Sequence, residues 1–236
     1  MLPSQPNESL IDGLACLQAL TVCKEPVGVR ELARRLDLEP TRVHRLLKTL
    51  AHLGVASQTP SRKYVTGPGM HVLAAQSIFA SGLIRKSLPF LAPLQKYGLV
   101  VAYGVLWRDQ VSYFYHAEPG MGVEQALGRI GLYPVTGSSI GMMLLSLNTD
   151  SEIRSLFKGR EITRFPEGVE SLLKDIREIR RKGYALIGSA KGHASLAVTV
   201  GNPPHSALAF SGGMGDGNIP KYYEILKDTA NKIEQA

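Results

Sequence analysis

The sequence predicts an α+β protein built from two parts. Near the N-terminus, apolar residues recur at helical spacing in three short segments, and a short hairpin pattern follows them. Beyond residue 83, several strand-like segments occur without the regular helix–strand alternation of a doubly wound fold. We therefore expect a helical domain over 1–66, a linker helix over 67–82, and an antiparallel sheet with helices over 83–236.

Composition bounds the class of protein. The chain has 236 residues, of which 44% are hydrophobic and 20% charged, as in soluble globular proteins of one or two domains. It contains no apolar run of about 18 residues, which a membrane span needs, and residues 1–12 lack the features of a secretory signal. Cys16 and Cys23 lie seven positions apart in one apolar segment and are expected to be small core residues. These features predict a cytoplasmic protein with no membrane partner.

The positive charge is concentrated in one short region. The net charge of the chain is +7. Between Arg30 and Lys63, eight basic and three acidic residues leave a net charge of +5 in 34 residues, whereas the other 202 residues carry +2. A basic cluster of this kind favours a polyanionic partner.

Three helices are predicted before the hairpin. The first covers 9–22 and the second 29–36. The third begins near Pro40, a residue suited to a first helical position, and ends at Gly54. Its apolar stripe at i, i+3, i+4 and i+7 spacing consists of Val43, Leu46, Leu47 and Leu50.

The face of the third helix opposite this stripe is polar and basic, and the hairpin "VASQTPSRKYVTG" has a basic tip. Three short helices and a basic hairpin describe a winged helix-turn-helix, in which the third helix enters the major groove of double-stranded DNA and the wing rests on the backbone. Two alternatives to DNA binding stay open. The third helix could simply be a charged helix that faces solvent, or the basic region could bind another protein. The residues expected to contact DNA are Arg30, Thr41, Arg42, His44, Arg45, Lys48, Arg62 and Lys63.

The remaining elements follow in order. Residues 83–97 suggest a helix interrupted by prolines, and strands are expected over 99–107 and 110–117, with "RD" as the turn. The segment 123–135 suggests a further strand pair. A short apolar helix follows Gly137, two amphipathic helices lie within 150–183, three strands lie within 184–212, and the chain ends in a helix.

The stretch "GSSIG" (137–141) matches G-x-S-x-G, the pattern of a strained turn that can present a nucleophilic serine. The preceding segment is a poor strand, since it is short and contains Pro134, and no acidic partner stands out for His193 or His205. A helix start at this turn instead offers free backbone N–H groups and serine hydroxyls to an anion. We therefore favour a ligand cradle made by Gly137, Ser138, Ser139 and Ile140, with helix capping and a hydrolase with a Ser139 nucleophile as alternatives.

The sequence resembles the IclR family of bacterial transcription regulators. The resemblance covers nearly the whole chain and is carried by "VRELARRLDLEPTRVHRLLKTLAHLGV", "SRKYVTGPGMHVL", "YPVTGSSIGMMLLS" and "IREIRRKGYAL" followed by "ALAFSG". It implies a winged helix-turn-helix, a linker helix and a GAF-like effector domain. It also implies pairing into homodimers or dimers of dimers, and an effector that is a small carboxylate, sugar acid or aromatic acid.

The resemblance adds residues to the predicted effector site. His193 and Ser195 align with a pocket-lining strand, and Ser211 lies at the end of the opposite strand. In this stretch, "LIGSAKGHASLAV" replaces the acidic run that is common in the family, so that Lys191 and His193 make the wall more basic. Aromatic candidates for the pocket wall, each also explicable as a core residue, are Tyr103, Tyr113, Tyr115 and Tyr133.

The motifs of several other functions are missing from the sequence. No P-loop or dinucleotide-binding glycine pattern occurs, and the cluster "SGGMGDGN" lacks the βαβ context that such binding requires. The spacing of histidine and cysteine residues does not indicate a metal site. We therefore expect neither a cofactor nor a metal, and a binding protein rather than an enzyme.

Overall fold

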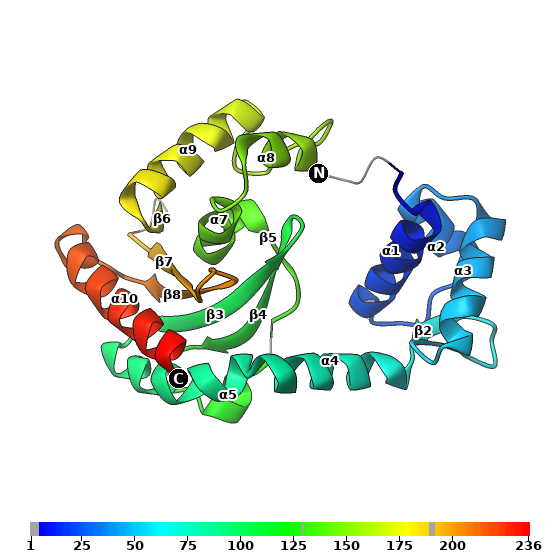
Figure 1. Ribbon diagram of the computed structural model, residues 1–236, viewed down its shortest axis with the longest axis horizontal. Coiled ribbons are helices and arrows are strands. Elements are labelled where there is room, and N and C mark those ends of the chain that lie inside the picture. The colour runs from blue at the N-terminus through cyan, green and yellow to red at the C-terminus, as the bar shows by residue number, and fades with distance from the viewer. Residues whose placement is uncertain (1–4, 129, 189–191) are drawn as a thin grey trace. The chain divides into compact units, whose positions relative to one another are not determined.

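The computed structural model describes residues 5–128, 130–188 and 192–236. The chain divides into two compact units between Leu83 and Ile84, and each unit is described by itself (Figure 1). No helix in the described part of the chain is long and apolar enough to cross a membrane.

The first unit contains the three predicted helices, α1 (Glu8–Val22), α2 (Val29–Leu36) and α3 (Pro40–His52). Asn7 caps α1, because its side chain accepts a hydrogen bond from the backbone N–H of Leu10. Asp37 ends α2 in the left-handed conformation, which asparagine and aspartate tolerate better than most residues. The turn between α2 and α3 is short and consists of residues 37–39.

A two-stranded wing follows α3. Strand β1 (Ala56–Gln58) pairs antiparallel with β2 (Tyr64–Thr66), and an additional bridge joins Val27 to Tyr64. The three helices and the wing share one small core, formed by Cys16, Leu20, Val27, Leu32, Ala33, Val43, Leu47, Ala56 and Tyr64. Cys16 thus has the core position that its apolar segment predicts, and both cysteines are free thiols.

Helix α4 (Pro68–Ser81) is the predicted linker helix. Gly67, which precedes it, passes so close to the wing that an added Cβ would lie 2.6 Å from the Ala56 carbonyl oxygen. No residue of helix α4 is buried, and Phe79 is 84% exposed. An apolar helix without a covered face is unusual in a monomer.

The second unit is built on a six-stranded antiparallel sheet with the strand order β5-β4-β3-β8-β7-β6. The strands are β3 (Val100–Trp107), β4 (Gln110–Ala117), β5 (Tyr133–Pro134), β6 (Ala185–Gly188), β7 (Ala194–Val200) and β8 (Ser206–Gly212). A register shift between β3 and β4 at Tyr103 and Gly104 marks a bulge in β4. The α+β class and the antiparallel sheet are confirmed.

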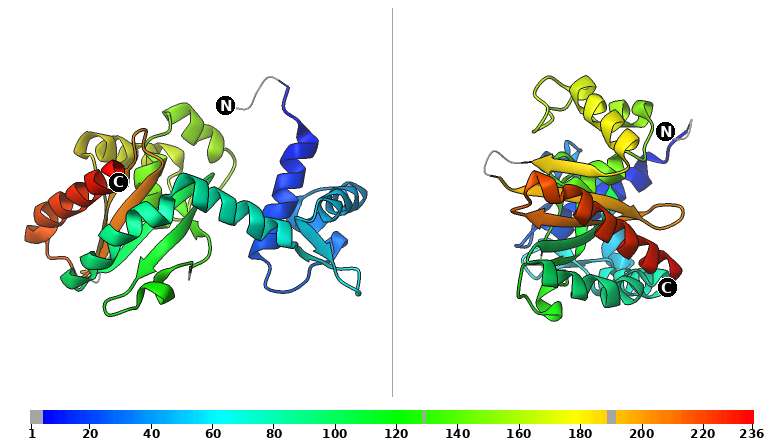
Figure 2. Two further views of the ribbon diagram at one scale, coloured as in Figure 1. Left: turned by 60° about the horizontal axis from the view of Figure 1, so that its bottom comes forward. Right: turned by 90° about the vertical axis from the view of Figure 1, so that its left-hand side faces the viewer.

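Helices cover both faces of this sheet (Figures 1 and 2). On one face, α7 (Ser139–Leu145) lies on the sheet beneath α9 (Val169–Lys182), and every residue of α7 is buried. Paired alanines of four strands leave room for it, namely Ala102, Ala209, Ala197 and Ala185. The other face carries α10 (Ile219–Gln235), whose Tyr222 ring contacts Phe210.

The prediction of a strand pair over 123–135 is wrong. Residues Val123–Ala126 form a short helix, α6. Leu127 makes an isolated bridge to Tyr115, and Tyr133–Pro134 pair with β4 as a two-residue strand. Glutamate, glutamine and alanine favour a helical turn, and Pro134 has no N–H with which to continue a ladder. The remaining elements are α5 (Leu83–Leu91), η1 (Ala92–Tyr97), η2 (Val135–Gly137), α8 (Asp150–Leu156) and η3 (Asp216–Asn218).

Candidate nucleic-acid interface and effector site

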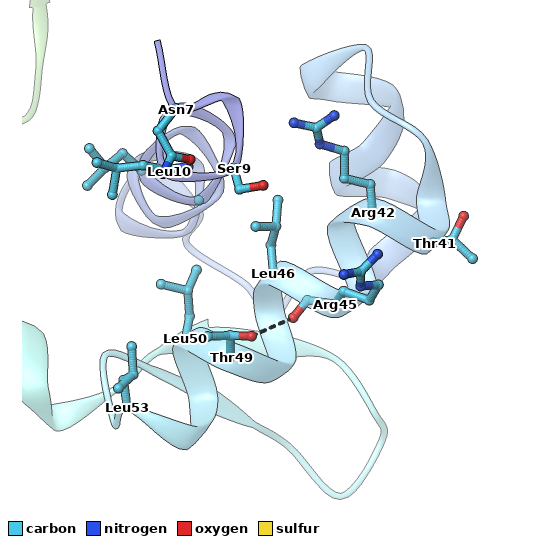
Figure 3. Close-up of a pocket in the computed structure, with 12 residues that line it drawn as sticks. Asn7, Ser9, Leu10, Thr41, Arg42, Arg45, Leu46, Thr49, Leu50 and Leu53 are labelled. Atoms are coloured by element: carbon cyan, nitrogen blue, oxygen red, sulfur yellow. Dashed lines mark hydrogen bonds between the residues drawn. The ribbon is translucent and has the colours of Figure 1, made fainter. Parts of the chain in front are cut away.

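The exposed face of α3 carries most of the residues predicted to contact DNA. Val43 and Leu47 are buried in the core, whereas Thr41, His44, Arg45 and Lys48 are exposed on the other side of the helix. Leu46 and Leu50 point toward α1, and Thr41 points away from it (Figure 3). The amphipathic pattern thus leaves a row of basic and hydrogen-bonding side chains free for a partner.

Arg42 differs from its neighbours on α3. Its Nε donates to Asp12 Oδ2 in α1 at 2.6 Å, and the two side chains are 43% and 14% exposed. This ion pair joins α3 to α1 on the flank of the exposed basic face of α3. Arg42 therefore has a structural partner, which its position in the sequence did not reveal.

The wing tip is a tight turn that displays two cations. The backbone N–H of Thr59 donates to the Lys63 carbonyl at 2.8 Å, and that of Arg62 donates to the Thr59 carbonyl at 2.9 Å. Arg62 has a φ of 60°, in the left-handed region. The Arg62 and Lys63 side chains are exposed, as is Arg30 in the first turn of α2.

A groove of about 720 Å³ lies between α1 and α3, beside the exposed basic face of α3 (Figure 3). Leu10 and Leu14 of α1 and Leu46 and Leu50 of α3 line it, together with Leu53, the C-cap of α3. Leu10, Leu14 and Leu53 are exposed. The apolar stripe of α3 was predicted to lie wholly in the core, but Leu46 and Leu50 also line this groove, which the sequence pattern did not indicate.

In the second unit, the structure brings three of the predicted serines together. Ser139 Oγ lies 2.6 Å from Ser195 Oγ, and Ser195 Oγ lies 2.5 Å from Ser211 Oγ. Sheet register explains the second contact, because Ser195 and Ser211 are cross-strand partners in β7 and β8. The first contact arises because α7 begins above these two strands. We call this row the hydroxyl chain.

Ser138 has a different role from Ser139. Its hydroxyl accepts a hydrogen bond from the Gly141 N–H at 3.1 Å, which caps α7, and it lies 2.7 Å from the Tyr113 hydroxyl. Burial raises the pKa of Tyr113, and the bond to Ser138 partly offsets this rise. Ser138 thus fits the helix-capping alternative, whereas Ser139 belongs to the hydroxyl chain.

Packing accounts for both glycines of the G-x-S-x-G match. An added Cβ at Gly137 would lie 2.9 Å from the Tyr133 ring. At Gly141, an added Cβ would lie 2.8 Å from Val111 Cγ2 and closer still to the Val135 carbonyl oxygen. The pattern therefore has a steric origin, in the close approach of α7 to β4 and η2 at Gly141 and in the contact of Gly137 with the Tyr133 ring of β5.

A cavity of about 580 Å³ opens at the hydroxyl chain. His193, Ser195 and Ser211, three of the predicted effector residues, line it together with Glu118 and Val100, which were not predicted. The sequence did not place Glu118 here, because the bulge in β4 shifts the register counted from the "RD" turn by one residue. Lys191, the other predicted cation of this wall, lies outside the described residues.

Not all predicted effector residues reach this cavity. Tyr103 and Tyr115 are fully buried cross-strand partners on the opposite face of the sheet, where their hydroxyls contact Ser206 at 2.9 Å and Gln95 at 3.1 Å. The structure therefore separates them from the hydroxyl chain, because alternate residues of a strand face opposite sides. Ile140 is buried in the core under α9, and Tyr133 is exposed beside Tyr113.

The environment of Ser139 is unlike that of a catalytic nucleophile. Its side chain is 3% exposed, and its hydroxyl contacts the hydroxyl of Ser195. A serine nucleophile needs a neighbouring base, such as an imidazole held by a carboxylate. Within the described residues, neither group contacts Ser139.

Together, these features define a winged helix-turn-helix unit followed by an antiparallel sheet unit with its own cavity. Two family profiles match the chain. The profile of the IclR helix-turn-helix domain matches residues 9–60, and that of the C-terminal domain of IclR bacterial transcriptional regulators matches residues 75–235. The chain belongs to the IclR family of bacterial transcriptional regulators.

Curated relatives and solved structures agree with this placement. The regulator KdgR of Escherichia coli (strain K12) is 29% identical over 194 residues, which cover 78% of this chain and 72% of KdgR. The regulator BhcR of Paracoccus denitrificans is 29% identical over 162 residues, which cover 66% of this chain and 58% of BhcR. The chain thus matches less than two thirds of the length of BhcR.

Two solved structures of low sequence identity share the fold. An IclR-family regulator from Brucella abortus has a TM-score of 0.76 at 20% identity, covering 97% of this chain and 92% of its own. An IclR homologue from Microbacterium hydrocarbonoxydans, solved in complex with 4-hydroxybenzoate, has a TM-score of 0.65 at 20% identity. The match covers 96% of this chain and 98% of the homologue.

Proposed function

We propose that this protein is a sequence-specific DNA-binding regulator that responds to a small metabolite. The observation that carries the first half is the exposed face of α3, with Thr41, Arg45 and Lys48 opposite a buried stripe and a basic wing beside it. A helix docked on its core in this way can lie in a major groove and read bases with its outer side chains. Residues 1–66 form the DNA-binding domain in this proposal, 67–82 the linker, and 83–236 the effector domain.

Substitutions in the interface test this assignment. If Arg45 reads a base, Arg45→Ala weakens specific binding and relaxes selection at one base position. Lys63→Ala, which removes a phosphate contact, lowers the salt slope by about one with little change in selection. Lys174→Ala removes an exposed charge from α9 and is the matched control. Wild-type affinity and salt dependence in both interface variants would refute the assignment.

Pairing of two copies is part of this proposal. α4 has no buried residue, and Val72, Leu73 and Phe79 are exposed. The resemblance to a family that pairs through its DNA-binding half supports a homodimer, which would place two α3 helices in successive major grooves about 34 Å apart. Phe79→Ser should shift the sedimentation equilibrium toward monomer. Leu186→Ser, which replaces an exposed leucine in the second unit, should not.

The second unit is proposed to bind the metabolite in the cavity at the hydroxyl chain. Its volume of about 580 Å³ is in the range of small-molecule sites, and Ser195, Ser211 and His193 offer hydrogen bonds to an anionic group. The complex of an IclR homologue with 4-hydroxybenzoate supports a carboxylate or aromatic acid, and sugar acids fit the same chemistry. The metabolite can change DNA affinity only if it favours one arrangement of the assembly over another.

Fluorescence anisotropy against duplex DNA from beside the gene, with a scrambled duplex in parallel, tests the whole proposal. We expect tighter binding to the native fragment, and release or tightening when the right acid or sugar is added. Equal binding to both duplexes would leave only an electrostatic footprint. No binding to either at low salt would refute DNA binding, and labelling of Ser139 by a fluorophosphonate would then favour a hydrolase.

A further inference from the structure

The hydroxyl chain has a direction. Three serine hydroxyls carry three protons, and the two hydrogen bonds within the chain use two of them. Ser139 is the buried end, and its hydroxyl contacts Ser195. A buried O–H that points at no acceptor is unfavourable. The stable arrangement therefore has Ser139 donating to Ser195 and Ser195 donating to Ser211, which leaves the proton of Ser211 for the cavity.

His193 favours an acceptor at this end of the cavity. It precedes Ala194, the cross-strand partner of Gly212, so that its ring and the Ser211 hydroxyl belong to the same end of the lining. A donor strengthened by a chain of hydrogen bonds, beside an imidazole, suits a carboxylate.

The other end of the lining presents an acceptor. Glu118 directly follows Ala117, the partner of Val101, and Val100 in turn pairs with Ser211. Glu118 therefore lies two strands away from Ser211, about 10 Å between Cα atoms at ordinary strand spacing. Val100 lies between them and offers an aliphatic surface. A carboxylate has about four acceptor positions, so Glu118 can accept from a ligand in addition to the contact it already makes.

We propose that the cavity selects a hydroxy acid whose carboxylate and hydroxyl are separated by a frame of about six carbons. The carboxylate accepts from Ser211, the hydroxyl donates to Glu118, and the carbon frame packs on Val100. This inference rests on the proposed effector function and specifies its ligand class. A two-carbon acid reaches only the Ser211 end. Glu118 is the specificity-determining residue, because it recognises the group that distinguishes a hydroxy acid from a plain acid.

Calorimetry on the full-length protein with matched pairs of acids tests the proposal. One pair is para-hydroxybenzoate and benzoate, and the other is hexanoate with and without a hydroxyl on its terminal carbon. The two pairs distinguish a ring frame from an open chain. In at least one pair we expect the hydroxylated acid to bind about tenfold tighter or more, as expected for a site that hydrogen-bonds a substrate hydroxyl. Glyoxylate should bind more weakly than either hydroxy acid.

Variants separate the two ends of the site. Glu118→Ala should remove the preference within a pair, and Glu118→Gln, which keeps an acceptor oxygen, should restore part of it. Ser211→Ala should weaken both members of a pair equally. Glu124→Ala removes an exposed acid that does not line the cavity and should change nothing. Native Trp107 fluorescence in each variant checks that the second unit is folded.

Several results would overturn this ligand class. They are equal binding within both pairs, a preference that survives Glu118→Ala, glyoxylate binding tighter than the hydroxy acids, or no binding of any hydroxy acid. The effector function itself is judged separately, by whether any metabolite changes DNA anisotropy in a manner that Ser195→Ala abolishes. A metabolite response without a role for Glu118 would refute the class and leave the function standing.

Discussion

Gly141→Ala should destabilise the second unit, although alanine is the better helix former. Alanine in place of glycine within a helix gains about 1 kcal/mol. The added Cβ, however, would lie 2.8 Å from Val111 Cγ2 and from Val135 Cα, and closer to the Val135 carbonyl oxygen. Overpacking of this kind costs about 1–3 kcal/mol, at the upper end here because two of the opposing atoms are backbone. The net loss should be about 1–2 kcal/mol, or roughly 2–8 °C in Tm.

Urea unfolding monitored by tryptophan fluorescence measures this loss. The chain has one tryptophan, Trp107 in β3, so the signal reports on the second unit alone. Gly131→Ala is the matched control, because an added Cβ there meets nothing within 4 Å and its φ is not in the left-handed region. If Gly141→Ala were as stable as the control, α7 would not be held by close approach to β4 and η2. The steric explanation of the G-x-S-x-G match would then fail.

Two further predictions concern titratable groups. Hydrogen bonds from Arg180 and Arg177 lower the pKa of Asp150, so the carboxylate stabilises the fold above the ordinary pKa of aspartate and this stabilisation is lost as the pH falls through the lowered value. Asp150→Asn should therefore be less stable than the wild type at neutral pH, with the difference in urea midpoint vanishing in acid. A constant difference would contradict this. Burial raises the pKa of Cys16 to about 11, whereas Cys23 is only partly buried, so a disulfide reagent at pH 8 should modify Cys23 first and Cys16 only on unfolding. Equal rates would refute the placement of Cys16 in the core.

Local sequence patterns determined most of the elements. The apolar stripe of Val43 and Leu47, with Pro40 at its start, was enough to predict α3 and its exposed basic face, because helix periodicity and capping are local properties. Strands β3 and β4 were predicted from alternation and a turn for the same reason. The segment 123–135 was mispredicted because a short apolar run does not distinguish a strand from a helical turn.

The grouping of side chains required the tertiary structure. Ser139, Ser195 and Ser211 are far apart in sequence, and their contact depends on the register of β7 with β8 and on the position of α7 above them. Tyr103 and Tyr115 matched the predicted chemistry equally well, but the register of β3 with β4, including the bulge after Tyr113, places them on the other face of the sheet. By itself, the sequence determined the class of fold and the basic helix, since both follow from local periodicity and charge. Only the tertiary structure decided which hydroxyls share a cavity and that Glu118 lies at its other end, because strand register and helix packing are non-local.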